Sequence, residues 1–162
     1  MSLSPVLIGQ SLPSSEILHE LHKLKTVGSV LFVAAHPDDE LLGCGGSIAK
    51  YINNGVLVKV LLLGEGSTAR YDDPSCKEAK AAITLRNSRA VKALGVIGVT
   101  DFEFYNLPCG RFDQIPIIEI NKIIESVIRQ FNPDTVFTHS EGDSNNDHKI
   151  VYRASIVATR PC

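Results

Sequence analysis

Residues 35–40, which read Ala-His-Pro-Asp-Asp-Glu, constrain the fold of this chain most strongly. They follow an apolar, β-favouring run at 30–35 that reads as a buried strand, and they precede a glycine-rich stretch at 43–46. One imidazole and three carboxylates therefore stand together at the end of a strand. Burying this much charge is costly unless it is paired, protonated or bound to a metal. The stretch predicts half of a metal site.

Length and charge limit the classes of protein. At 162 residues the chain is most simply one domain with a real core, and its net charge of −2 gives no argument for nucleic acid or for an anionic membrane surface. No apolar run approaches the ~20 residues that a membrane span needs. The N-terminus lacks the basic, apolar and small-residue order of a secretory signal. We expect a cytoplasmic protein whose oligomeric state, monomer or homo-oligomer, stays open.

The four cysteines stand at positions 44, 76, 109 and 162, without a CxxC pair. This spacing favours neither a zinc ribbon nor a disulfide scaffold, and it is typical of reduced thiols in a cytoplasmic protein.

Hydrophobic periodicity predicts alternating strands and helices. Strands are expected at 29–35, 56–63, 101–105 and 135–139, helices at 13–25, 41–54, 76–94, 115–131 and 148–160, and polar loops at 64–75, 107–114 and 140–147. This order predicts an α/β domain at 29–162, with a mostly parallel sheet and helices on both faces, after an N-terminal extension at 1–28. Helix 115–131 suits a core or an interface equally.

Two polar segments follow strands of this sheet. Ligands of open α/β sheets bind outside the carboxyl ends of the strands. Residues 36–40 lie at one such end and residues 140–148 at another, so the two segments can meet in one crevice although they are far apart in the sequence.

The residue types in this crevice suit a divalent metal. His36 supplies an imidazole nitrogen and Asp39 a carboxylate oxygen, which both bind zinc and also other divalent ions. A catalytic zinc uses three protein ligands and an open position for water, and His148 is the best candidate for the third ligand. Asn145, Asn146 and Asp147 can cap the helix that His148 opens.

The remaining polar residues suggest hydrolysis of a carbonyl compound. Asp38 could take a proton from the attacking water, and Asp147 could orient a metal ligand. His139 either touches the site or simply satisfies the core. Arg70 either binds an anionic substrate group or is solvated. The glycines at 43–46 favour close helix packing over a phosphate cradle, because the GxGxxG order is absent.

At this point the motifs resemble a known family. Residues 35–40 followed by 43–46 are similar to the signature of the PIG-L/LmbE-like N-deacetylases, and Asp147-His148 after Thr138-His139 resembles the second motif of that family. The resemblance covers about residues 29–160. It implies a Rossmann-like fold, a divalent metal that is usually zinc (Fe²⁺ being an alternative), and hydrolysis of an acetamide on a sugar or glycoconjugate. It also implies that His36, Asp39 and His148 are the metal ligands and Asp38 the general base.

The chain departs from this family pattern in three places. Asn145 stands where many members have a histidine that stabilises the oxyanion or protonates the leaving amine, and an asparagine cannot shuttle a proton. Family members usually continue for some tens of residues beyond Cys162, so we expect the C-terminal part of the catalytic domain to be missing. The loop at 107–113 carries a neutral Cys109-Gly110 pair and bears on substrate choice.

The sequence is consistent with three hypotheses about function. The first is a zinc-dependent N-deacetylase acting on an N-acetylated amino sugar or glycoconjugate. The second is a metal-dependent amidase or deformylase acting on a non-sugar amide. The third is a catalytically incomplete α/β domain that binds a metal or a nucleotide.

Overall fold

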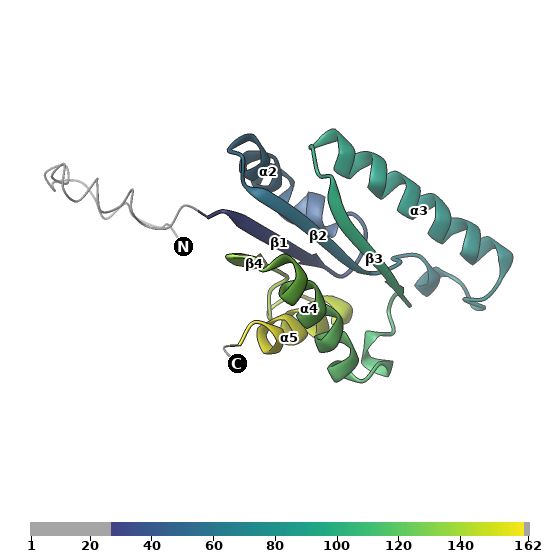
Figure 1. Cartoon of the computed structure of the whole chain (residues 1–162). Coiled ribbons are helices and arrows are strands. Elements are labelled where there is room, and N and C mark those ends of the chain that lie inside the picture. The colour runs from purple at the N-terminus through teal and green to yellow at the C-terminus, as the bar shows by residue number, and fades with distance from the viewer. Residues whose placement is uncertain (1–26, 161–162) are drawn as a thin grey trace, which may run out of the picture.

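A four-stranded sheet forms the centre of the protein. The computed structural model describes residues 27–160, and in this part of the chain the strands are ordered β3-β2-β1-β4 (Figure 1). Every pairing between them is parallel. The strands are Ser29–Ala34 (β1), Leu57–Gly64 (β2), Asp101–Leu107 (β3) and Thr135–Phe137 (β4). The predicted α/β fold with a parallel sheet is confirmed.

Helices cover both faces of this sheet, as the sequence predicts (Figure 1). They are Asp39–Asn53 (α2), Lys77–Val96 (α3), Ile117–Phe131 (α4) and Asn146–Ala158 (α5), with short 3₁₀ helices at Thr68–Arg70 (η1) and Phe112–Gln114 (η2). Successive strand side chains point to opposite faces, so two cores form. Val30 and Phe32 of β1 pack with residues of α2 and α3, whereas Leu31 and Val33 pack with α4 and α5. Helix 115–131 thus contributes to the core through its buried apolar face.

The strand order places the site. β1 lies between β2 and β4, and the chain leaves it toward α2, whereas it leaves β4 toward α5. The carboxyl ends of β1 and β4 are therefore neighbours at a point where the strand order reverses, which is where open α/β sheets bind their ligands. The segments after these two strands carry the predicted site residues.

Two element ends differ from the sequence prediction near the site. β4 ends at Phe137 rather than at residue 139, and Phe137 pairs with Phe32 as the last partner in the ladder. The backbone N–H of Ala35 donates instead to Nε2 of His139 at 2.8 Å, so a side chain takes the place of the next strand residue. α2 begins at Asp39, two residues earlier than predicted, because the chain turns directly after His36.

Other ends shift by small steps. β3 continues to Leu107, beyond the predicted residue 105, because Leu107 pairs with Gly64 across an irregularity in the ladder. α5 begins at Asn146, and Asn145 is its N-cap, with Oδ1 accepting the N–H of Asp147 at 2.9 Å. The helix predicted at 13–25 lies outside the described residues. None of the helices described is long and apolar enough to cross a membrane.

Candidate metal centre

The turn after β1 presents the first half of the site. The backbone N–H of Asp39 donates to the carbonyl of His36 at 3.3 Å, which closes a tight turn around Pro37. Asp38 is the N-cap of α2 and has a φ of 116°, a left-handed conformation that few residues other than glycine adopt. Its N–H donates to Oε2 of the buried Glu40 at 3.0 Å. The buried Glu40 carboxylate therefore helps to hold this strained turn.

The three predicted metal ligands converge. Nδ1 of His36 lies 3.5 Å from Oδ2 of Asp39, and Nε2 of His148 lies 3.1 Å from the same oxygen. The centroids of the two imidazole rings are 5.5 Å apart. One ligand atom from each residue thus lies within 4.8 Å of the other two, which is the spacing that one bound ion requires.

The far nitrogen of His36 is held by a buried carboxylate. Nε2 of His36 lies 2.9 Å from Oδ2 of Asp147, which is 1% exposed. The same carboxylate accepts the backbone N–H groups of Gly110 at 2.6 Å and Phe112 at 3.2 Å. Because Asp147 engages Nε2 of His36, Nδ1 is the nitrogen that faces Asp39 and that would give its lone pair to a bound ion. The predicted orienting role of Asp147 fits this geometry.

His148 is oriented in the same manner by a residue that the sequence analysis missed. Nδ1 of His148 lies 2.9 Å from Oδ2 of Asp143. Its Nε2 atom is buried and has no hydrogen-bond partner among the described residues, although Asp39 is near. The sequence does contain a signal for this contact, because Asp143 stands in the same polar loop, five positions before His148.

The candidate centre has a negatively charged environment. Burial acts to lower the pKa of His36, but hydrogen bonds to Asp147 and Asp39 outweigh it and raise the pKa to about 11. Burial acts to raise the pKa of Asp39, but the hydrogen bond to His36 and the charge of His148 hold it below its usual value. A pocket that retains a proton so strongly provides the negative environment that a divalent ion would meet.

Within residues 27–160, two other groupings of possible ligands share residues with this one. They are His36 with Cys109 and Asp147, and His139 with Asp143 and His148. Each joins a histidine to the carboxylate that it already hydrogen-bonds. In the set of His36, Asp39 and His148, each histidine can offer the ring nitrogen that its carboxylate partner leaves available. One of these, Nε2 of His148, has no hydrogen bond among the described residues. The mixed nitrogen and oxygen donors of this set fit a divalent ion such as zinc.

His139 touches the site. Its ring stacks on that of His148, with centroids 4.0 Å apart and an interplanar angle of 22°, and its Nε2 lies 3.8 Å from Oδ2 of Asp39. Burial and the charge of His148 lower the pKa of His139 to about 4. The imidazole is therefore neutral at pH 7, and its Nε2 already accepts the N–H of Ala35.

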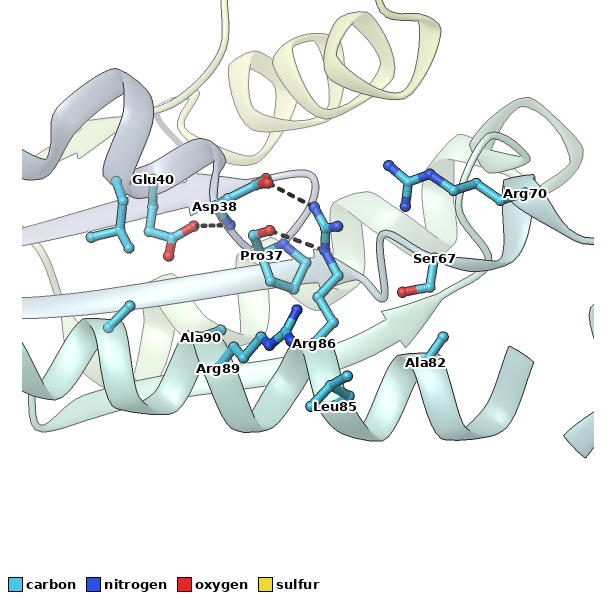
Figure 2. Close-up of a pocket in the computed structure, with 12 residues that line it drawn as sticks. Pro37, Asp38, Glu40, Ser67, Arg70, Ala82, Leu85, Arg86, Arg89 and Ala90 are labelled. Carbon is cyan, nitrogen blue, oxygen red and sulfur yellow. Dashed lines mark hydrogen bonds and ion pairs between the residues drawn. The ribbon is translucent and has the colours of Figure 1, made fainter. Parts of the chain in front are cut away.

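Asp38 faces a different partner. Its Oδ2 lies 2.8 Å from Nη2 of Arg86 on α3, and Nε of Arg86 donates to the carbonyl of Pro37 at 3.2 Å (Figure 2). Asp38 and Arg86 line a pocket of about 390 Å³, and Arg70 lines it as well. The contact of Arg86 could not be predicted from the sequence, because Arg86 lies 48 positions from Asp38 and no local pattern relates the register of its helix to this turn.

Comparison with protein families agrees with this geometry. Residues 31–159 match the family model described as PIG-L, GlcNAc-PI de-N-acetylase. The chain belongs to the PIG-L family. The resemblance drawn from its two motifs is confirmed.

Several proteins of known name or structure are similar to this PIG-L chain. The uncharacterized deacetylase YaiS of Escherichia coli (strain K12) is 26% identical over 151 residues, which are 90% of this chain and 74% of YaiS. Diacetylchitobiose deacetylase of Thermococcus kodakarensis is 35% identical over 113 residues, which are 68% of this chain and 40% of that protein. These relatives are longer than the chain described here.

Solved structures show the same fold. N,N'-diacetylchitobiose deacetylase from Pyrococcus horikoshii superposes with a TM-score of 0.71 at 22% identity, covering 93% of this chain and 60% of that one. GalB, the 4-carboxy-2-hydroxymuconate hydratase from Pseudomonas putida KT2440, superposes with a TM-score of 0.67 at 27% identity, covering 80% of this chain and 55% of that one. The fold therefore carries more than one chemistry, and the site must decide between them.

In this PIG-L chain two buried carboxylates fix the loop between β3 and α4. Asp147 holds Gly110 and Phe112, and Oε1 of Glu65 accepts the N–H of Cys109 at 2.8 Å. Glu65 also accepts the backbone N–H groups of Ser67 and Thr68. The loop at 107–113, which was expected to bear on substrate choice, is thus fixed beside the candidate centre by hydrogen bonds from its backbone N–H groups.

Proposed function

We propose that the chain is the catalytic part of a zinc-dependent N-deacetylase that removes an acetyl group from an amino sugar or glycoconjugate. The observation that carries the proposal is the convergence of His36, Asp39 and His148, with each imidazole oriented by a carboxylate from the far side. Family membership and similarity to named deacetylases support the reaction and the substrate class.

His36, Asp39 and His148 would hold the ion, which supplies a Lewis acid beside the amide carbonyl. Zinc fits the donors, and Fe²⁺ fits them too. Within residues 27–160, Nε2 of His148 makes no hydrogen bond and lies 3.1 Å from Oδ2 of Asp39, which leaves it available as a ligand. The protein's part is to keep these donors aimed at one point while Asp147 and Asp143 keep the proton on the other nitrogen of each ring.

Asp38 would act on protons. It accepts a proton from the attacking water as the water oxygen bonds to the carbonyl carbon. It then delivers that proton to the amine nitrogen as the carbon–nitrogen bond breaks, and acetate and a free amine leave. We assign both transfers to Asp38, because Asn145 does not titrate and uses its oxygen to cap α5, and because Nε2 of His139 is engaged by Ala35.

The test is acetate release by the zinc-loaded protein. N-acetylglucosamine and diacetylchitobiose would be compared with non-sugar acetamides and formamides, with and without a chelator. Chelator-sensitive acetate release from the sugars supports the proposal. Turnover of non-sugar amides alone supports the amidase or deformylase, and zinc binding without any turnover supports the incomplete domain.

One second candidate has an observation in its favour. GalB is named as a hydratase of a carboxylated compound, and three arginines line the pocket beside Asp38 in this chain. Guanidinium groups suit carboxylates. Hydration of an unsaturated carboxylic acid can be measured as the loss of its ultraviolet absorption. Such hydration without any release of acetate would favour this second function.

A further inference from the structure

Arg86 holds the turn that carries the proposed base at two points. Its Nε donates to the backbone carbonyl of Pro37 at 3.2 Å, and its Nη2 lies 2.8 Å from Oδ2 of Asp38 (Figure 2). Arg86 belongs to α3, whereas the turn joins β1 to α2. One side chain from a separate element therefore fixes both the backbone and the carboxylate of the turn. The planar guanidinium suits this task, because its donors point in fixed directions.

The turn needs such support because its backbone is strained. Asp38 has a φ of 116°, in the left-handed region that residues with a side chain rarely adopt. Such conformations persist only where surrounding contacts determine them. Among residues 27–160, the side chains that hydrogen-bond Pro37 or Asp38 are Glu40, two residues along the same helix, and Arg86. Arg86 therefore supplies the side-chain contact from a distant part of the chain.

Arg86 is itself fixed by the loop after β2. Gly66 has a φ of +69°, and a Cβ atom at this position would lie 2.6 Å from Nε of Arg86. The backbone of Gly66 therefore packs directly on the guanidinium. The buried carboxylate of Glu65 accepts the N–H groups of Ser67 and Thr68, which fixes the chain on both sides of Gly66. The arginine is thus a prearranged donor rather than a mobile surface side chain.

The pairing leaves half of the Asp38 carboxylate available. Oδ2 accepts from Arg86, and Oδ1 makes no hydrogen bond within residues 27–160. The Asp38 side chain is 53% exposed, so water can reach it. Because each carboxylate oxygen has its own lone pairs, Oδ1 can accept a hydrogen bond from water while Oδ2 stays on Arg86.

We propose that Arg86 is a positioning residue for the reaction, which holds Asp38 so that Oδ1 meets the attacking water in one geometry. This inference rests on the proposed function, because it takes Asp38 as the base. Arg86 acts through Asp38 and needs no contact with the substrate. Its loss should therefore lower kcat and leave KM unchanged, since a misplaced base costs turnover rather than substrate binding.

The kinetic test is acetate release from diacetylchitobiose by the zinc-loaded protein. Arg86→Ala should lower kcat about 10- to 100-fold, as the loss of one charged hydrogen bond predicts, with KM and zinc content unchanged. Guanidinium ion added in millimolar amounts should restore part of this kcat. Arg86→Lys should have an intermediate kcat, because an ammonium can pair with Asp38 but lacks the planar fork. Lys92→Ala, which removes an exposed cation from the same helix, is the matched control and should keep the wild-type kcat.

A double variant shows whether Arg86 acts through Asp38. In Asp38→Asn the base is absent, so adding Arg86→Ala should change the residual kcat by no more than about twofold. A further loss of about tenfold would overturn the inference, because Arg86 would then act on another group. A higher KM in Arg86→Ala with an unchanged kcat would overturn it as well, since Arg86 would then be a substrate contact. So would a kcat equal to or above that of the wild type.

Hydrogen exchange gives a readout that does not depend on turnover. Followed by mass spectrometry, residues 36–42 should exchange faster in Arg86→Ala than in the wild type, whereas β1 should keep its rate, because only the turn loses a contact. If Arg86→Ala loses stability throughout the chain, Arg86→Lys is judged by the same criteria.

The two readouts together separate this inference from the proposed function. Faster exchange of the turn in Arg86→Ala, without any acetate release by the wild type, would overturn the function while Arg86 still holds Asp38. Acetate release by the wild type, with kcat and exchange unchanged in Arg86→Ala, would overturn the positioning role while the function stands.

Discussion

Nδ1 of His148 lies 2.9 Å from Oδ2 of Asp143, and this contact leaves Nε2 as the nitrogen that faces Asp39. Asp147 does the same for His36. Each half of the candidate centre thus consists of an imidazole and a carboxylate behind it, and the two halves meet on the single carboxylate of Asp39. Such outer carboxylates set the tautomer and orientation of the ligand.

Removing Asp143 should weaken the metal site without unfolding the protein. In Asp143→Ala the ring of His148 loses its fixed orientation, so we expect zinc affinity to fall about 10- to 100-fold. Competition with a chromophoric chelator measures this affinity. Glu141→Ala, an exposed change in the same loop, is the control and should retain wild-type affinity. Unchanged affinity in Asp143→Ala would show that Asp143 does not position His148.

Asp38→Asn should separate metal binding from catalysis. The amide cannot accept the proton of water, so we expect kcat to fall by about 10²- to 10⁴-fold. Zinc content, measured by atomic absorption, should stay at one ion per chain, because Asp38 is outside the ligand set. Full activity in this variant would remove Asp38 from the role of base.

Gly66→Ala should destabilise the loop that packs on Arg86. The new Cβ meets Nε of Arg86 at 2.6 Å, and a φ of +69° strains any residue with a side chain. We expect the free energy of unfolding to fall by about 1–3 kcal/mol in urea denaturation. Gly46→Ala provides a control of opposite sign: this site in α2 has open space, so the change should stabilise by about 0.5–1 kcal/mol. Equal stability of the two variants would contradict the close packing of Gly66 on Arg86.

Lys59 should stabilise the sheet in a pH-dependent manner. Its ammonium lies 2.7 Å from Asp101 and 2.9 Å from Glu103 on the neighbouring strand. Burial acts to lower the pKa of Lys59, but these carboxylates outweigh it and raise the pKa above the usual 10.5. The native state therefore binds this proton more tightly than the unfolded chain does. The stabilisation is complete below pH 10.5 and is lost as the pH rises through the folded-state value.

Lys59→Met tests this linkage. At pH 7 its free energy of unfolding should be lower by about 1–3 kcal/mol, and the deficit should shrink above pH 10.5. Lys92→Met, at an exposed position of α3, should match the wild type at every pH. A deficit in Lys59→Met that stays constant from pH 7 to 11 would point to packing rather than charge.

The elements and the three candidate metal ligands could be predicted from the sequence for local reasons. Buried parallel strands read as continuous apolar runs, and His36 and Asp39 follow one such run directly. His148 stands out because it follows the polar segment at the end of the strand predicted at 135–139. These signals depend only on neighbours in the chain and on the general rule that ligands bind at the carboxyl ends of strands.

The contacts that the sequence did not predict depend on tertiary structure. Arg86 meets Asp38 because α3 packs in one particular register against the turn after β1, and no local period encodes that register. Asp143 meets His148 through the path of a loop. His139 ends β4 early because its ring, rather than a strand residue, accepts the N–H of Ala35. Each of these three contacts is made by one side chain, and the hydrophobic pattern of the sequence does not determine it.

The proposed function requires that His36, Asp39 and His148 together hold one ion. Anomalous diffraction at the zinc absorption edge, from crystals grown with zinc, tests it most directly. We expect a single strong peak per chain, about 2.0–2.2 Å from Nδ1 of His36, a carboxylate oxygen of Asp39 and Nε2 of His148. A peak held instead by Cys109 with Asp147, or by Asp143 with His139, would contradict it, as would crystals that show no peak at this set of residues.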